Sequence, residues 1–271
     1  MKLFNESLTT RFNTLERNIK SKSNSFYDSY LDLLEATIKY FLDENNEWYE
    51  IENIVLGEEI SEIGETQFSN FKSLRSIEIP ESIIKIEYEA FLGCEKLENV
   101  YYHGTVEDWM KIEFIGWGSN PMIYAKHFYI LDEKNKWYEP QIIKIKSGTT
   151  EIKDNMFRNF SSLISIEIPS SVTYFGSEAF TGCSQLQTVY YHGTIEEWMT
   201  INSYSNPMSY AKYLYVLDEN GEFVEPTELV IPEGTTEIRD YLFQNFNSLR
   251  KVIFPSSLER IGYGNFGMNS K

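Results

Sequence analysis

The sequence predicts a β-rich α/β solenoid, because stretches of its 271 residues recur at two fixed spacings. The longer spacing is 89 residues, from SLRSIEIP at 73–80 to SLISIEIP at 162–169, and a third copy follows 86 residues later at 248–255. The shorter spacing is 23 residues, and it separates Phe68 from Phe91 and Phe157 from Phe180. Repeats of this kind stack into coils that share one elongated core, so we explain residues kept between copies first by stacking and only then by chemistry.

Each 23-residue unit is expected to form one coil. It begins with a strand of alternating apolar residues and turns at Pro or Gly. A second short extended piece then ends near Ile63, Ile86, Ile152 or Ile238, and a short helical turn carrying the Phe follows. Because strand side chains alternate between faces, the central residue of each first strand should point outward. We expect these outward residues to form an exposed ligand-binding ladder: Val55, Glu78, Tyr101, Lys144, Glu167, Tyr190, Val230 and Ile253.

The chain divides into an N-terminal helical segment, 1–47, and a solenoid, 48–271, with super-repeats at about 50–139, 140–225 and 226–271. Apolar residues at helical spacing predict one helix near the start of the chain and a second from Phe26 to about Leu42. The apolar face of the first helix is formed by Leu8, Phe12, Leu15 and Ile19. Two interpretations stay open: the segment caps the first coil, or residues 1–24 dock on a larger assembly or self-associate.

The longer step between super-repeats contains an insertion. A helix is expected after Thr105 and after Thr194, where the sequences TVED and TIEE have the form of a capping box. A short helix at 120–122 or 206–208 and then a strand at 128–131 or 214–217 should follow. The segment DENG at 218–221 predicts a type I′ hairpin turn, since Asn-Gly supplies its two positive φ angles.

The repeated residues resemble a known family. The pattern Leu-x-x-Ile-x-Ile-Pro, followed by Ile-x-x-Ile-x-x-x-Ala-Phe-x-Gly-Cys-x-x-Leu, is similar to the BspA-type leucine-rich repeat of bacterial surface proteins over roughly residues 51–267. The inserted Tyr-Tyr-His-Gly-Thr-x-x-x-Trp stretch is similar to one in members from gut Firmicutes. The resemblance implies a leucine-rich-repeat fold and a binding role, without a shared set of catalytic residues.

Composition excludes several partners. The net charge is −17, from 41 acidic and 24 basic residues, and such a surface repels nucleic-acid phosphates and anionic lipid headgroups. We therefore expect no nucleic-acid partner. No apolar run approaches the roughly 18–20 residues that span a bilayer, so no membrane insertion is expected. The first residues, MKLFNE, do not read as a signal peptide, which favours a virion or cytoplasmic location, with the cell surface as an alternative.

The candidates for chemistry are few. His103 and His192 have no accompanying nucleophile motif, so we interpret them as closing a strand-to-helix turn, with Trp109 and Trp198 packed over the core. Cys94 and Cys183 should each be a buried free thiol on separate coils. The three histidines show no metal-ligand spacing, and no cofactor, metal site or catalytic residue is predicted.

What remains is a surface, and we interpret the protein as a non-enzymatic binding or display module for a protein or surface glycan. A start without a signal and with an unpaired amphipathic helix favours a bacteriophage virion protein that exposes the solenoid to host or mucosal surfaces. The alternatives are a cell-surface adhesin of a Firmicute and a cytosolic protein-interaction scaffold. An enzyme is the reading that the sequence supports least.

Overall fold

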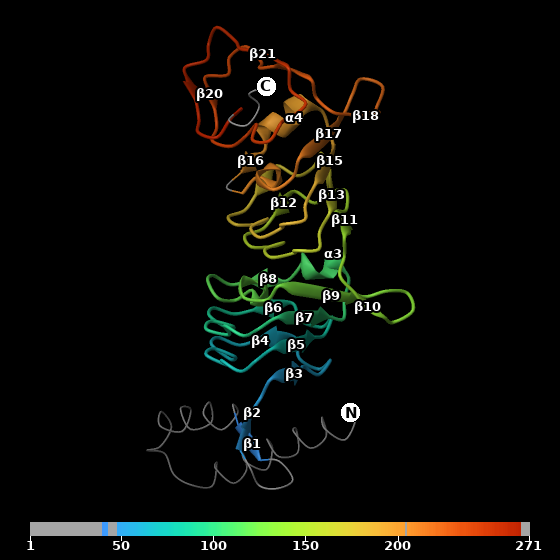
Figure 1. The fold of residues 1–271 in the computed structure, drawn as a ribbon, viewed down its shortest axis with the longest axis vertical. Helices are drawn as coiled ribbons and strands as arrows, with labels where there is room; N and C mark the ends of the chain where they lie inside the picture. Colours follow the sequence, from blue (N-terminus) through green and yellow to red (C-terminus); the bar gives the residue numbers. More distant parts are fainter. Residues whose placement is uncertain (1–39, 43–47, 204, 267–271) are drawn as a thin grey trace.

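Each repeat unit forms one coil of a column in the computed structural model, which describes residues 40–42, 48–203 and 205–266, with side chains from residue 51 on (Figure 1). Within each super-repeat, the first strand of one coil pairs in parallel with the first strand of the next, so that Val55 lies beside Glu78 and Glu78 beside Tyr101. These strands are β3 (Asn53–Val55), β5 (Ser76–Ile79), β7 (Asn99–Tyr102), β9 (His127–Leu131), β11 (Ile142–Lys144), β13 (Ser165–Pro169), β15 (Thr188–His192), β17 (Tyr213–Leu217), β19 (Glu228–Val230) and β21 (Lys251–Ile253).

A second row of short parallel strands forms another side of the column. In each, the Ile, Phe or Ser of one coil pairs with its equivalent in the next, as Ile63 does with Ile86. The strands are β4 (Glu62–Ile63), β6 (Lys85–Ile86), β8 (Glu113–Phe114), β12 (Glu151–Ile152), β14 (Tyr174–Phe175), β16 (Asn202–Ser203), β20 (Glu237–Ile238) and β22 (Arg260–Ile261). Four of them, β4, β6, β12 and β20, end at the residues where the sequence predicts the second extended piece of the coil.

The predicted helical turn after the second strand is an irregular run of tight turns. Thr66 and Asn70 both have positive φ, 53° and 58°, and equivalent coils place such residues at the same four-residue spacing. A residue in the left-handed region cannot continue a right-handed helix. The chain is thereby folded back towards the next strand within a few residues. The other pairs are Glu89 and Gly93, Asn155 and Asn159, Glu178 and Gly182, and Tyr241 and Asn245.

The insertions contain the predicted short helices. α3 (Val106–Trp109) and α4 (Ile195–Thr200) each begin at a Thr whose hydroxyl accepts from the third backbone N–H, and both capping boxes are complete. The 3-10 helices η1 (Pro121–Ile123) and η2 (Pro207–Ser209) follow, each capped by an Asn side chain. The helical content of the described chain is therefore small, and confined almost entirely to the insertions.

Each insertion ends in an antiparallel hairpin. β9 pairs with β10 (Trp137–Tyr138), and β17 with β18 (Phe223–Val224). A third hairpin joins β1 (Tyr40–Leu42) to β2 (Trp48–Glu50). The predicted helix from residue 26 to about 42 is therefore wrong at its C-terminal end, because Tyr40–Leu42 pairs as a strand with Trp48–Glu50. The rest of that helix, and the proposed docking residues Leu8, Phe12, Leu15 and Ile19, lie outside the described residues.

The hairpin turn at Asp218 is not the type I′ turn that the sequence suggests. Only Gly221 has positive φ there, as Asn135 does in the first hairpin. The Asp218 carbonyl accepts from Gly221 N at 3.0 Å. Its carboxylate Oδ1 accepts from the backbone N–H groups of Asn220 and Glu222, at 2.9 Å each. The Asp218 side chain thus stabilises the loop through hydrogen bonds to its backbone, and the turn forms without the second positive φ angle of a type I′ turn.

The apolar interior runs through the coils as one cluster. Trp109 and Trp198 are buried in it, as predicted. Cys94 and Cys183 are free thiols, fully buried, with Sγ atoms 3.0 Å and 3.1 Å from the carbonyl oxygens of Phe68 and Phe157. Burial raises the pKa of the Cys183 thiol to about 12. Both thiols thus act as small apolar packing groups.

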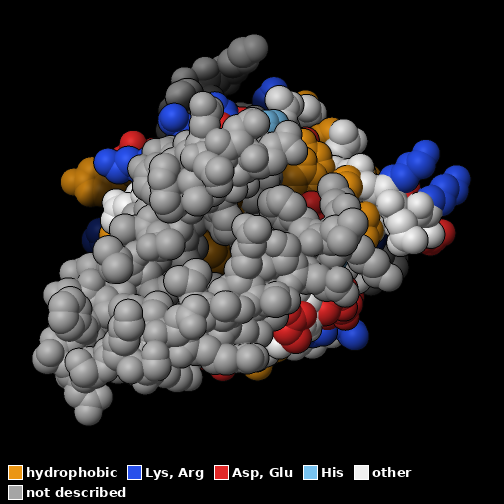
Figure 2. Space-filling view, turned by 90° about the horizontal axis from the view of Figure 1, so that it is seen from below, with side chains coloured by type: hydrophobic (Ala, Val, Ile, Leu, Met, Phe, Trp, Pro, Cys, Tyr) orange, Lys and Arg blue, Asp and Glu red, His pale blue; other side chains and the backbone are white. Residues whose placement is uncertain are grey.

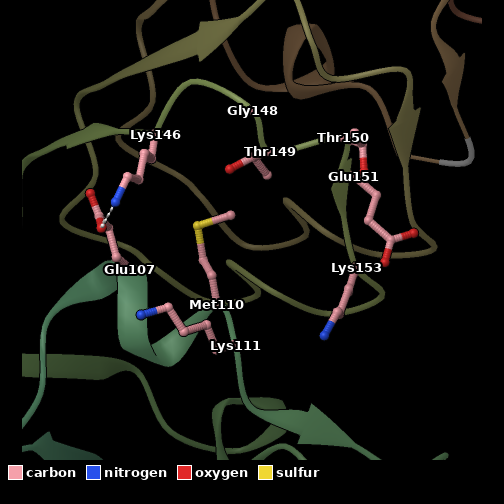
Figure 3. A pocket seen from close by; sticks show the side chains of 9 residues that line it. All are labelled: Glu107, Met110, Lys111, Lys146, Gly148, Thr149, Thr150, Glu151 and Lys153. Atoms are coloured by element: carbon pink, nitrogen blue, oxygen red, sulfur yellow. Dashed lines mark ion pairs between the residues drawn. The ribbon is translucent and has the colours of Figure 1, made fainter.

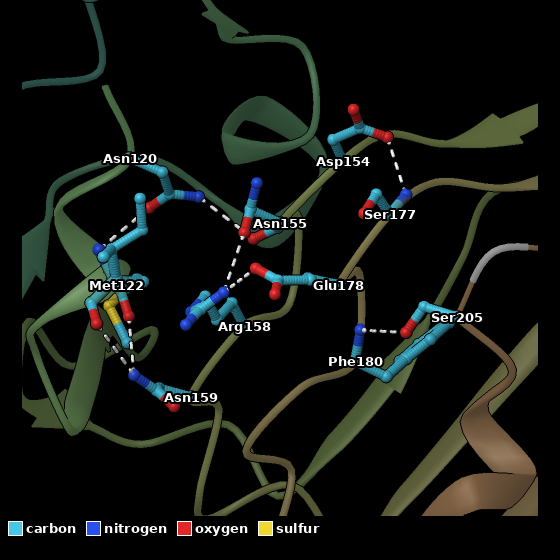
Figure 4. Close-up of polar contacts among 11 residues, drawn as sticks. Asn120, Met122, Asp154, Asn155, Arg158, Asn159, Ser177, Glu178, Phe180 and Ser205 are labelled. Carbon is cyan, nitrogen blue, oxygen red and sulfur yellow. Dashed lines mark hydrogen bonds and ion pairs between the residues drawn. The ribbon is translucent and has the colours of Figure 1, made fainter. Parts of the chain in front are cut away.

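The strand ladder is interrupted at the junctions between super-repeats. There, hydrogen bonds from asparagine side chains connect one super-repeat to the next. β9 pairs with β7 and β10, whereas β11 pairs only with β13. Across this gap Asn120 Nδ2 donates to Asn155 O at 3.1 Å, and Asn159 Nδ2 donates to Met122 O at 2.8 Å (Figure 4). Asn206 and Asn245 make the corresponding bonds at the next junction.

Within the described part of the chain, no helix could cross a bilayer.

Candidate binding face

The ladder residues lie on the outer face of the first-strand sheets. Val55, Val230 and Ile253 are 48%, 52% and 44% exposed, and Lys144 is also exposed. The other rungs, Glu78, Tyr101, Glu167 and Tyr190, are partly exposed. Their strand neighbours point inward and are buried, for example Ile77, Ile79, Val100, Tyr102, Ile166, Ile168, Val189 and Tyr191. At the last described coil the pattern ends, because Phe254 beside Ile253 is 45% exposed.

The rungs do not form one continuous stripe. The breaks after β9 and β17 divide them into three runs: Val55, Glu78 and Tyr101; then Lys144, Glu167 and Tyr190; then Val230 and Ile253. In the first two runs the neighbouring strand of the insertion adds a further rung, so that Tyr101 lies beside Tyr129 and Tyr190 beside Tyr215. In these two runs, the hairpin therefore adds aromatic side chains at the end of the run.

Aromatic cluster 1 comprises Glu78, Tyr101, His103, Tyr129 and Trp137. The rings of Tyr101 and Tyr129 are stacked, with centroids 4.7 Å apart and an interplanar angle of 14°. Trp137, from the returning strand β10, meets Tyr101 edge-on at 5.1 Å and His103 at 5.0 Å. His103 Nε2 lies 3.3 Å from Glu78 Oε2. The cluster thus joins three aromatic rings to a His–Glu pair on the surface of the sheet.

Aromatic cluster 2 comprises Glu167, Tyr190, His192, Tyr215 and Phe223, and it repeats this arrangement. Tyr190 and Tyr215 are stacked at 5.1 Å and 16°. Phe223 takes the place of Trp137, 5.3 Å from Tyr190 and 5.0 Å from His192. His192 Nε2 lies 3.3 Å from Glu167 Oε2. The same five positions therefore meet in the same geometry in both super-repeats.

The two clusters differ in their charged neighbours. In cluster 2, Lys144 Nζ lies 2.7 Å from Glu167 Oε1. Burial raises the pKa of the Glu167 carboxyl, but hydrogen bonds from Lys144 and His192 outweigh it and hold that pKa below its usual value. In cluster 1 the flanking pair is His127 and Glu139, with Nδ1 and Oε1 2.8 Å apart. Burial, aided by the Glu139 charge and by Tyr101, raises the pKa of Tyr129 above its usual value.

The histidines occupy the place predicted for them. His103 N donates to Ile79 O at 3.0 Å, closing the strand before α3. Among the described residues, each of the His103 and His192 rings contacts a glutamate and an aromatic ring, and neither contact is a Ser or Cys nucleophile. Across the described residues, no three His, Cys, Asp or Glu side chains come together as a metal-binding group.

A cleft of about 440 Å³ lies at the first junction, between α3 and the segment that joins β11 to β12 (Figure 3). It is lined by Glu107, Met110, Lys111, Lys146, Gly148, Thr149, Thr150, Glu151 and Lys153. Two of its lysines are held by acidic residues: Lys146 Nζ is 3.7 Å from Glu107 Oε2, and Lys111 Nζ is 2.7 Å from Asp108 Oδ1. At the second junction Thr200 and Pro232 stand in place of Lys111 and Lys146, so the lysines of this cleft are not repeated.

Sequence reasoning missed four members of the clusters: Tyr129, Trp137, Tyr215 and Phe223. A signal for them exists, since Tyr129 and Tyr215, and likewise Trp137 and Phe223, are 86 residues apart, as are the turn residues Asp132 and Asp218. What spacing alone does not show is that the hairpin places these rings against the ladder tyrosines.

Viewed along the column, hydrophobic side chains reach the surface beside charged ones (Figure 2).

Comparison with known proteins gives one strong match. Residues 44–116, 136–209 and 222–271 match a family model described as BspA type leucine rich repeat region, in six copies. No curated protein matches the chain.

Several solved structures are similar to this one. A leucine rich cell surface protein from Faecalibacterium prausnitzii A2-165 is 22% identical, covering 82% of this chain and 70% of its own, with a TM-score of 0.38. A leucine-rich repeat protein from T. pallidum is 18% identical, covering 86% and 87%, with a TM-score of 0.27. One from Bacteroides ovatus is 18% identical, covering 86% and 84%, with a TM-score of 0.26.

Proposed function

The chain belongs to the BspA-type leucine-rich repeat family, and we propose that it is a non-enzymatic binding module whose contact surface is the strand face with aromatic clusters 1 and 2. One observation carries this proposal: a Tyr–Tyr pair, a third ring and a His–Glu pair recur in matching geometry on the outside of the sheet. Stacking of the coils explains repeated core residues, but it does not require this outer arrangement.

The clusters lie outside a core that is already closed beneath them. Ile77, Ile79 and Val100 are fully buried on the inner side of the strands that carry cluster 1. Tyr and Trp give a large contact area at low entropic cost and dominate the energetics of many interfaces. A partly exposed group of them, rimmed by His and Glu, combines an apolar centre with hydrogen-bonding edges, as binding surfaces do.

The partner we propose is a protein or a surface glycan. The net charge of −17 disfavours nucleic acid and anionic lipid surfaces, whose binding depends on Lys and Arg contacts. The pairs Glu78–His103 and Glu167–His192 add carboxylates to the binding face itself. Within the proposal, a polyanion is therefore the least suitable ligand.

For its setting, we propose display on a larger assembly, held through residues 1–24, with a bacteriophage virion as the first candidate. A cell-surface adhesin and a cytosolic scaffold are the alternatives. What supports display is the column itself, which presents its binding face along its length (Figure 1). Proteins that co-purify with the untagged chain from its native source distinguish the three settings.

The binding face is tested with the double substitution Tyr101→Ser and Tyr190→Ser. Screening of immobilised glycans and host surface proteins finds ligands of the wild-type chain. Because aromatic hot spots contribute about 2 kcal/mol or more each, the double variant should then lose about 30-fold in affinity for a ligand that contacts one of the tyrosines and about 1,000-fold for a ligand that contacts both. The matched control replaces Tyr88 and Tyr263, which are 44% and 77% exposed away from the ladder. Equal affinities of the wild type and the ladder variant would refute the proposed face.

A further inference from the structure

We propose that clusters 1 and 2 are two equivalent subsites that bind one uncharged, repeating polysaccharide at the same time. This inference rests on the proposed function of the same face and goes beyond it, because it names the ligand class and the mode of binding. It is carried by the likeness of the two clusters, their fixed relation along the column and the charge around them.

The two clusters would accept the same chemical unit. The stacked tyrosines are 4.7 Å apart in one and 5.1 Å in the other, and the edge-on ring is 5.1 Å and 5.3 Å from the ladder tyrosine. In both, the His ring lies 5.0 Å from that edge-on ring and 3.3 Å from its glutamate. A ligand with one epitope needs only one such cluster, whereas a polymer of identical units can fill both.

The distance between the subsites is held by the packing of the first junction. Phe128 and Phe160 stack across it at 4.5 Å, and Trp109 Nε1 donates to Met156 O at 3.3 Å. The side chains of Asn120 and Asn159 bond across the same junction. Both hairpins, β9–β10 and β17–β18, project from the same side of the column (Figure 1). Three paired-strand spacings, roughly 14 Å in all, and the unpaired junction between β9 and β11 separate β7 from β15, so the ligand that fills both clusters must be longer than a disaccharide.

The charge and chemistry of the clusters favour a neutral sugar polymer. Glu78 and Glu167 can accept hydrogen bonds from hydroxyl groups, and the aromatic rings offer apolar faces and edges to the C–H groups of a sugar ring. Glu139 beside cluster 1 and the net charge of −17 repel sulfated or carboxylated polymers. A neutral polysaccharide meets none of this repulsion.

Bivalence makes a quantitative prediction. When both subsites hold one polymer, the second contact is intramolecular, and the avidity exceeds the single-site affinity by about 10²–10⁴-fold. Removing either cluster should therefore weaken polymer binding by about 100-fold or more. The same change should leave the affinity of a disaccharide for the remaining cluster unchanged and reduce its stoichiometry from two per chain to one.

The test uses Trp137→Ser for cluster 1 and Phe223→Ser for cluster 2, because both residues lie on hairpin strands outside the buried core cluster. Soluble neutral glucans, mannans and galactans, with their disaccharides and with hyaluronate as an anionic probe, are titrated calorimetrically against the full chain and each variant. Thermal unfolding verifies that the variants are folded, and Tyr101→Ser and Tyr190→Ser replace any variant that is not. Tyr88→Ser is the control.

The outcomes separate the two proposals. Loss of polymer avidity in both single-cluster variants supports bivalence. If one variant loses all binding and the other none, or if no neutral polysaccharide binds, bivalent recognition is overturned, while a protein ligand lost on Tyr101→Ser and Tyr190→Ser would still support the proposed function. Hyaluronate binding as strong as that of the neutral polymers overturns the ligand class. A ligand unaffected by every ladder variant overturns both proposals.

Discussion

At the residue scale, the super-repeats share their packing but not all their hydrogen bonds. Trp109 Nε1 donates to Met156 O, whereas Trp198 Nε1 has no partner among the described residues. The carbonyl that corresponds to Met156 O is that of Leu242, and Asn206 Nδ2 already donates to it at 3.3 Å. The buried Tyr102 hydroxyl also has no partner within the described chain. Each such group costs stability that the apolar ring around it must offset.

The first prediction concerns that hydroxyl. Tyr102→Phe should raise the free energy of unfolding by roughly 1 kcal/mol, because it removes an unpaired buried polar group and keeps the ring. Tyr102→Ser removes the ring as well and should lower it by about 3–5 kcal/mol. Urea unfolding of the two variants measures both effects. A clear loss of stability in Tyr102→Phe would mean that the hydroxyl has a partner.

The second prediction concerns the pH dependence of stability that follows from the burial of Tyr191, the residue equivalent to Tyr102 in the second super-repeat. Burial, with the Glu197 charge, raises the pKa of Tyr191 to about 12, above the value of about 10 in an unfolded chain. Since the folded state holds this proton more tightly, the stabilisation is complete below about pH 10 and is lost as pH rises through 12. Tyr191→Phe should therefore flatten the fall of the melting temperature between pH 10 and 12. Part of the fall should remain, because burial raises the pKa of Tyr102 too; an unchanged slope contradicts the assignment.

At the scale of elements, one asparagine at each junction both caps a 3-10 helix and donates hydrogen bonds to the next super-repeat. Asn206 Oδ1 accepts from Met208 N and so caps η2, while its Nδ2 donates to the carbonyls of Tyr241 and Leu242 in the next super-repeat. Asn120 is placed in the same way at the first junction. These bonds stand where the strand ladder is missing, and they couple the short helix of one super-repeat to the turns of the next.

We therefore expect Asn206→Ala and Asn120→Ala each to lower the free energy of unfolding by about 1–3 kcal/mol, the cost of a lost cap and of buried groups left unpaired. The matched control is Asn247→Ala, since the side chain of this exposed residue donates a long bond of 3.4 Å to Lys212 O at the second junction. Guanidinium unfolding compares the three variants. If Asn206→Ala costs no more than Asn247→Ala, the junction is held by apolar packing alone.

At the scale of the whole molecule, interrupted sheets are combined with a continuous core. The strands form separate sheets, but the buried residues form one cluster, so neighbouring super-repeats keep a fixed relation. Such linear architectures present long surfaces that compact domains of equal size cannot. The two aromatic clusters use this property, because each is completed within its own super-repeat and repeated along the column (Figure 1).

The sequence by itself determined the repeat, the positions of the first strands of the coils, the facing of each rung, the burial of both cysteines and the capped helices of the insertions. These properties follow from periodicity and from capping residues that act within a few positions of the chain. The helix from Phe26 to about Leu42 was predicted by the same logic, and at Tyr40–Leu42 this prediction failed because pairing with Trp48–Glu50 overrode the helical spacing.

Only the tertiary structure decided which distant side chains meet. Tyr101 and Trp137 are neighbours because a hairpin folds back beside the ladder, and Asn120 reaches Asn155 because two super-repeats stack without strand pairing. Contacts of this kind depend on how turns direct the chain in space. The periodicity of the sequence shows which side of the sheet a residue occupies, but it does not show what the next element brings to that side.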